Sequence, residues 1–115
     1  MVDPPFVDRR LCDRVPVEYS ASFSAGWLQR AHGVISELSA AGCRARSTSV
    51  MKKDDCVKVL IDVPRYEDPL QIMRAAVRWV REQEFGLEFL QLEPTDRRRL
   101  LDLLSAIKAA RRRRE

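Results

Sequence analysis

Arginine is the residue type in this chain best suited to binding chemistry. Seventeen of its 21 cationic residues are arginine, whose planar guanidinium pairs bidentately with phosphate, carboxylate or guanine edges, where lysine offers only a point charge. Three of them, Arg9, Arg10 and Arg14, lie close together near the N-terminus. The net charge of +4 would suit an anionic partner, but residues 111–115 (four Arg, one Glu) supply +3 of it and residues 1–110 only +1. Local geometry must therefore decide which anion is bound.

Patterns typical of catalysis or of a metal site are missing from the sequence. It contains no GxSxG, HExxH or Walker loop, and its single histidine, His32, has no second histidine or cysteine pair nearby. Cys12, Cys43 and Cys56 match no CxxC pattern and leave one thiol unpaired in any disulfide scheme. We therefore expect no enzyme, no metal and no cofactor. Reduced thiols, no secretory signal and no 18-residue apolar run lead us to expect a cytoplasmic protein.

Alternation of apolar and polar residues, typical of half-buried strands, recurs along the chain. At 115 residues, with 45% hydrophobic and 33% charged residues, the chain suits one globular domain. Strands are predicted over residues 15–23, 27–36, 42–48, 56–63 and 85–92. The clearest has Val57, Val59, Ile61 and Val63 on one face. Gly86, within the last of them, indicates a bend or a close backbone approach.

Residues 70–84 are compatible with two structures. Ile72, Ala76 and Val80, spaced by four, fit a helix. As a strand, the segment would turn inward the side chains of Met73, Ala75, Val77 and Trp79. If this segment is a strand, the chain has six strands followed by a C-terminal helix. That order favours an antiparallel barrel or roll.

A helix is predicted after the last strand. Pro94 and Thr95 open it, with Thr95 as the N-cap and Asp96 adding negative charge to the first turn. Four apolar residues form a stripe at helical spacing: Leu100, Leu103, Leu104 and Ile107. This stripe must cover another apolar surface, so we expect the helix to pack on the barrel.

Two short motifs resemble those of the PilZ domain family, which are RxxxR in an N-terminal loop and (D/N)xSxxG on the barrel. Arg10 and Arg14 supply the first motif, preceded by Arg9, and Ser39 and Gly42 match the second. Glu37 departs from the pattern, because it stands where the family has Asp or Asn. The resemblance continues through strand-like and helical segments at residues 76–80, 85–92 and 95–107, and covers roughly residues 8–108.

The resemblance implies an all-β fold, a six-stranded antiparallel PilZ-type β-barrel with a C-terminal α-helix, and it favours the strand for residues 70–84. The expected division of the chain is a flexible N-terminal segment over residues 1–8, a single PilZ-like domain over residues 9–108 and a basic C-terminal tail over residues 109–115.

The function that the resemblance implies is that of a receptor for cyclic di-GMP, a bacterial second messenger with two guanines and two phosphates. The implied binding residues are Arg9, Arg10, Arg14, Glu37, Ser39, Gly42 and Trp79. The arginines suit phosphate oxygens or guanine O6 and N7, Glu37 can accept from guanine N–H groups, Ser39 can donate to a phosphate or fix the turn, and Gly42 permits a close approach. The ligand would order the arginine segment, and the changed surface would signal to a protein partner in trans or to a second copy of the chain.

Two other functions remain open. The first is a PilZ-like adaptor that does not bind the nucleotide and acts through protein contacts alone, with Glu37 marking a degenerate site. The second is a small basic barrel that binds nucleic acid through Arg97–Arg99 and Arg111–Arg114. Each motif also has a structural alternative, since the arginines suit a solvated loop and residues 37–42 suit an ordinary polar turn.

Overall fold

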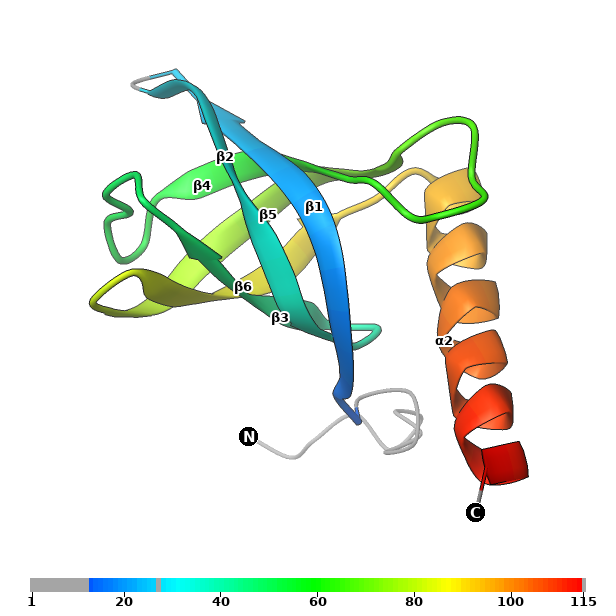
Figure 1. Cartoon of the computed structure of the whole chain (residues 1–115). Helices are drawn as coiled ribbons and strands as arrows, with labels where there is room; N and C mark the ends of the chain where they lie inside the picture. Colours follow the sequence, from blue (N-terminus) through cyan, green and yellow to red (C-terminus); the bar gives the residue numbers. More distant parts are fainter. Residues whose placement is uncertain (1–12, 27, 115) are drawn as a thin grey trace, which may run out of the picture.

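The six predicted strands form a closed antiparallel barrel (Figure 1). This computed structural model describes residues 13–26 and 28–114. The strands are β1 (Val15–Ala25), β2 (Leu28–Leu38), β3 (Gly42–Ser47), β4 (Cys56–Ile61), β5 (Leu70–Arg81) and β6 (Glu84–Gln91), followed by α2 (Pro94–Arg114). Their order around the barrel is β1-β2-β3-β6-β5-β4, and pairing of β4 with β1 closes it. The predicted fold is therefore confirmed.

The barrel interior is filled by the apolar residues of each alternating pattern. Phe23 of β1 and Phe85 of β6 meet edge to face at its centre, with ring centroids 5.3 Å apart. The predicted face of β4 is confirmed, since Val57, Val59, Ile61 and Val63 are all buried. In β3, Cys43 and Ala45 point inward, so Arg44 between them points outward.

In β5 the strand structure is confirmed, but the predicted inward face is only partly right. Ala75 and Val77 are buried, whereas Met73 and Trp79 are only half-buried. The reason is two register shifts against β6, one of them between Val77 and Trp79, where β5 carries an extra residue. Such a bulge reverses the face on which the following side chains lie. It brings Trp79 to the outer wall of the barrel.

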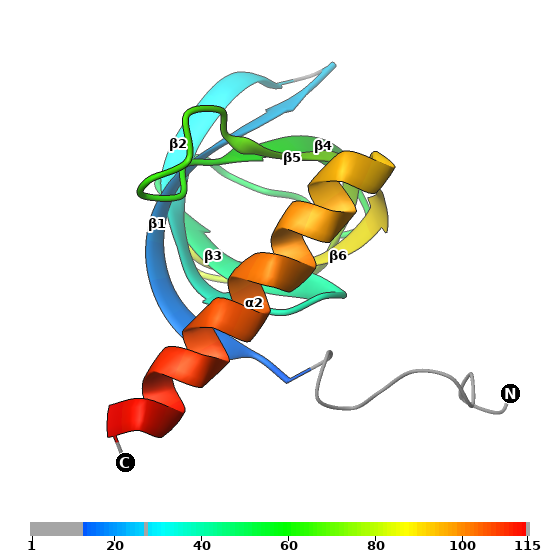
Figure 2. The ribbon, with the colours of Figure 1, turned by 90° about the vertical axis from the view of Figure 1, so that its right-hand side faces the viewer.

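Helix α2 lies across one end of the barrel (Figure 2). Its apolar stripe is confirmed, with Leu100, Leu103 and Leu104 buried and Ile107 half-buried. The predicted N-cap at Thr95 is wrong, because the helix begins at Pro94 and the Arg97 N–H already donates to the Glu93 carbonyl at 2.9 Å. Proline suits the first helical position, where no N–H is needed. The helix continues through residues 109–114, so the basic segment extends the same rod.

Within the described ranges, no helix is long and apolar enough to cross a membrane.

Candidate functional site

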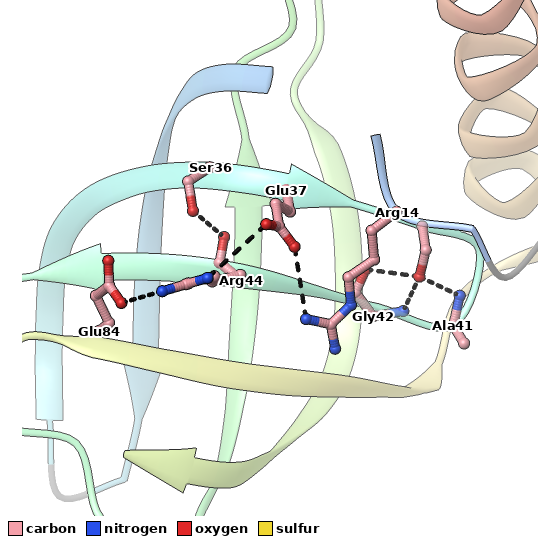
Figure 3. Close-up of polar contacts among 8 residues, drawn as sticks. Arg14, Ser36, Glu37, Ala41, Gly42, Arg44 and Glu84 are labelled. Carbon is pink, nitrogen blue, oxygen red and sulfur yellow. Dashed lines mark hydrogen bonds and ion pairs between the residues drawn. The ribbon is translucent and has the colours of Figure 1, made fainter. Parts of the chain in front are cut away.

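Four of the predicted site residues lie at or near the turn between β2 and β3, namely Arg14, Glu37, Ser39 and Gly42, and Figure 3 labels three of them, Arg14, Glu37 and Gly42. Arg14 directly precedes β1, and Glu37 lies near the end of β2. Ser39 is in the turn, and Gly42 begins β3. Arg9 and Arg10 lie outside the described residues.

The buried Ser39 side chain organises this turn. Its hydroxyl donates to the Gly42 carbonyl at 3.1 Å and accepts from the N–H groups of Ala41 and Gly42 at 3.2 and 3.1 Å. A hydroxyl has only one proton to donate. Of the two roles predicted for Ser39, its hydroxyl proton therefore serves the turn in this structure.

Gly42 lets two strands approach each other. A Cβ atom at this position would lie 2.1 Å from the Leu87 carbonyl oxygen of β6, a separation that no side chain tolerates. Because Gly42 has no side chain, β3 can lie this close to β6, and the turn stays against the barrel wall.

Glu37 bridges two arginines (Figure 3). One carboxylate oxygen lies 3.7 Å from Nη1 of Arg14, and the other lies 3.8 Å from Nη1 of Arg44. Arg44 in turn makes a very short hydrogen-bonded ion pair with Glu84 of β6. The hydrogen bond and the charge of Glu84 raise the pKa of Arg44 above its ordinary value, so this guanidinium stays charged.

These charges belong to a row of residues that crosses four strands, which we call the outer row. Glu37 of β2 pairs with Arg44 of β3, and Arg44 pairs with Gly86 of β6. Gly86 pairs in turn with Trp79 of β5. Arg44 reaches along the row, and its guanidinium carbon lies 5.7 Å from the centroid of the Trp79 ring. The row thus joins a carboxylate, a cation and an aromatic ring on the outer wall.

A hollow of about 220 Å³ opens beside the outer row, and we call it the motif hollow. Its lining combines predicted site residues with residues of β5 and β6: Arg14, Ser39, Ala41, Gly42, Arg78, Trp79, Gly86, Leu87 and Glu88. Arg78 Nε donates to Glu88 at 2.6 Å across its rim. The hollow therefore offers two guanidiniums, one carboxylate and an indole, a set that suits a phosphorylated aromatic ligand.

Sequence reasoning missed Arg44, Arg78 and Glu88 as neighbours of the site. Arg44 follows Gly42 by two residues, and the alternation of β3 could have shown that it points outward. Its contact with Glu37 depends on the pairing register of two strands, which no local pattern reveals.

Among the described residues, no group of three or more His, Cys, Asp and Glu side chains could hold a metal ion.

A barrel with a charged, aromatic hollow on its wall defines a ligand-binding module. Residues 8–106 match the family model described as the PilZ domain, and the chain belongs to the PilZ domain family. No curated protein matches the sequence.

Three solved structures show the same fold. The YcgR protein of Escherichia coli in complex with c-di-GMP has a TM-score of 0.76 and 18% identity, over 99% of this chain and 54% of that chain. The PilZ domain of E. coli YcgR with c-di-GMP has a TM-score of 0.73 and 12% identity, and the match covers 93% of this chain and 97% of that chain. The Bacillus subtilis inhibitor of motility (MotI/DgrA) has a TM-score of 0.71 and 17% identity, and the match covers 93% of this chain and 56% of that chain. The chain thus spans little more than half the length of two of these proteins.

Proposed function

We propose that this chain is a receptor that binds cyclic di-GMP at the motif hollow. The observation that carries the proposal is that Arg14, Ser39 and Gly42 of the two motifs come together with Trp79 around a single hollow, with Glu37 beside it on the outer row. Family membership supports the same ligand, since two structural neighbours were solved with c-di-GMP.

The chemistry of the hollow suits both parts of the ligand. The guanidiniums of Arg14 and Arg78 can pair with phosphate oxygens or with guanine O6 and N7, and Trp79 offers a face on which a base can stack. Glu37 can accept hydrogen bonds from the N–H groups of guanine. A phosphate and a guanine of the dinucleotide therefore each have counterparts in or beside the motif hollow.

The ligand has to replace the ion pair between Arg14 and Glu37. Both side chains are partly exposed, and the pair is long at 3.7 Å. Exposed ion pairs contribute about 0.2–1 kcal/mol, whereas a bidentate contact between arginine and guanine is worth about 1–3 kcal/mol. Replacement is therefore favourable, and Glu37, once released from Arg14, is still held by Arg44.

Signal output would come from the changed surface around Arg14. The ligand can shift the conformation only by its preference for one state, and the state that it prefers is the one in which Arg14 turns from Glu37 to the ligand. A protein partner, or a second copy of the chain, would read that surface.

Isothermal titration calorimetry with cyclic di-GMP tests the proposal. We expect Arg14→Ala to weaken binding roughly 5- to 150-fold, the value of one bidentate arginine contact. Arg74→Ala is the matched control, because Arg74 is an exposed arginine of β5 outside the motif hollow. No heat at high micromolar ligand would refute the receptor and leave the adaptor. The nucleic-acid alternative predicts instead that the protein binds nucleic acid, that this binding weakens steeply with salt, and that it is lost when residues 111–114 are deleted.

Glu37→Asp is the second variant in this series. The shorter side chain cannot keep both ion pairs, now 3.7 and 3.8 Å long, so Arg14 becomes free for the ligand. We expect roughly two- to five-fold tighter binding, which corresponds to the free energy of one exposed ion pair. Weaker binding would mean that the longer reach of glutamate serves the ligand.

A further inference from the structure

A second hollow lies on the barrel wall next to the motif hollow, and the two share the Trp79 side chain. It is lined by Arg44, Trp79, Val80 and Arg81 and has a volume of about 390 Å³. None of the motif residues that the structure describes, Arg14, Ser39 and Gly42, lines it. The Trp79 side chain therefore lines both hollows, whereas the described motif residues line only the motif hollow.

The motif hollow alone is small for a cyclic dinucleotide. Sites for drug-sized ligands usually have volumes of about 300–1,000 Å³. The motif hollow, at about 220 Å³, falls below that range, and a cyclic dinucleotide carries two purines, two riboses and two phosphates. The two hollows together fall within the range. A ligand with two bases thus has enough space if one base lies in each hollow.

The lining of the second hollow suits a purine. Arg44 is held in place by ion pairs with Glu84 and Glu37, and its guanidinium carbon lies 5.7 Å from the Trp79 ring centroid, so a guanidinium plane is held beside the indole. Val80 is 40% exposed and adds an apolar patch beside it. Purine bases stack on aromatic rings and on guanidinium planes.

Arg81 supplies the free hydrogen-bond donors of this hollow. Among the described residues it forms no ion pair or side-chain hydrogen bond, unlike Arg44 and Arg78. It stands at the end of β5, directly before Glu82, whose φ of 56° forms a tight turn into β6. An exposed arginine without a carboxylate partner can offer its fork to an incoming acceptor at no cost in broken contacts. Guanine presents O6 and N7 to such a fork, whereas adenine presents N7 beside a donor.

We propose that the second hollow is a subsite for one guanine of the dinucleotide, in which the Arg44 guanidinium, held beside Trp79, offers the stacking plane and Arg81 distinguishes guanine from adenine. This proposal rests on the proposed function, because it assigns the second base of the same ligand. It makes Arg81 a specificity-determining residue that lies outside both motifs.

Titrations with three ligands test the subsite: cyclic di-GMP, the mixed cyclic GMP–AMP with one guanine, and cyclic di-AMP. We expect the wild type to prefer cyclic di-GMP over cyclic GMP–AMP. Arg81→Gln should weaken cyclic di-GMP binding roughly 5- to 150-fold and leave cyclic GMP–AMP binding nearly unchanged, so the preference disappears. Arg74→Gln is the control, because Arg74 is an exposed arginine of the same strand that lines neither hollow and makes no ion pair among the described residues.

The outcomes separate the two proposals. If the wild type binds cyclic di-GMP and Arg81→Gln keeps the preference between the ligands, or weakens both equally, the subsite is refuted and the receptor stands. If the wild type binds none of the ligands, both proposals fail. Thermal melting of Arg81→Gln checks folding, and the exposed position predicts no change. Quenching of Trp79 fluorescence by each ligand, in a Trp27→Phe background, gives a second measure of base stacking.

Discussion

Trp79 owes its place on the barrel wall to a glycine. A Cβ atom at Gly86, the residue opposite on β6, would lie 2.0 Å from the indole nitrogen and 2.5 and 2.7 Å from two ring carbons. The indole therefore covers the backbone of Gly86. Only glycine at this point lets the ring reach across β6 toward Arg44, so Gly86 positions the aromatic ring that both hollows share.

Gly86→Ala should displace the indole. The new methyl group takes the space of the ring, so we expect a loss of about 1–3 kcal/mol in the free energy of unfolding, a red-shifted Trp79 emission and weakened ligand binding. Urea unfolding and fluorescence in a Trp27→Phe background measure these effects. Gly26→Ala is the control, because a Cβ atom there has nothing within 4 Å. An unchanged emission spectrum would contradict this account of Trp79.

At this scale the sequence predicts residue types better than contacts. Gly86 is predicted to mark a bend or a close backbone approach, and the structure shows a close approach of another kind, because the group that lies against Gly86 is the Trp79 side chain. The pairing of Arg44 with Glu37 was missed, since it depends on which residue of β3 lies beside which residue of β2. The bulge that turns Trp79 outward likewise leaves no mark in the alternation of β5.

Helix α2 is tied to the barrel at its first turns by Arg99. Arg99 Nη1 donates to the Pro69 carbonyl at 3.2 Å and to Asp96 at 2.9 Å, and the guanidinium lies 4.9 Å from the Tyr66 ring centroid. Asp96 also accepts from the Gln71 N–H of β5 at 3.2 Å. Arg99, together with its partner Asp96, thus joins the helix to the loop between β4 and β5 and to the start of β5.

Arg99→Ala should loosen this connection. Hydrogen bonds that involve a charged group are worth about 1.5–3 kcal/mol, and Arg99 makes several, so we expect a loss of that order in the free energy of unfolding. Arg98→Ala is the control, because Arg98 is exposed and makes no ion pair within the described part of the chain. Equal urea midpoints for the two variants would show that the apolar stripe alone holds the helix.

The strands and the helix stripe could be predicted because each buries one face at a regular period, as β4 and Leu100, Leu103 and Leu104 show. The start of the helix could not be placed from Thr95, since a strong N-cap residue is also common within the first turn. Pro94 was the better guide, because its fixed φ suits the first helical position.

Cys43 lies in the closed interior of the barrel, so its thiol can be used to test whether the barrel is closed. This side chain of β3 is fully buried, and burial raises the pKa of its thiol from 9.0 to about 12. The folded protein therefore binds this proton more tightly than the unfolded chain does. The stabilising effect is complete below about pH 9 and is lost as the pH rises through about 12.

Thiol labelling tests this closure. At pH 8 in a Cys12→Ser background, we expect an aromatic disulfide reagent to modify the half-buried Cys56 quickly. Cys43 should react only when the barrel opens, at a rate that rises with urea. Labelling in full denaturant, where both thiols react alike, is the control. Equal rates for the two thiols in the native protein would contradict a closed barrel.

The barrel as a whole could be predicted from the order of its elements together with the motif resemblance. The order of six strands and a helix alone left a roll possible beside the barrel, and the local pattern of residues 70–84 left a helix possible there. Only the pairing of β5 with both β4 and β6 completes the wall.

Closure also limits how another protein can recognise this one. Each of the six strands already has a neighbour on both sides. An incoming peptide therefore finds no strand with a whole edge free, and strand addition is limited to strand ends that extend past their partners, such as residues 15–19 of β1, which pair with β2 but not with β4. A partner therefore meets mainly side chains, on the barrel wall or along the basic helix, and these are the surfaces where interface mutations should be sought.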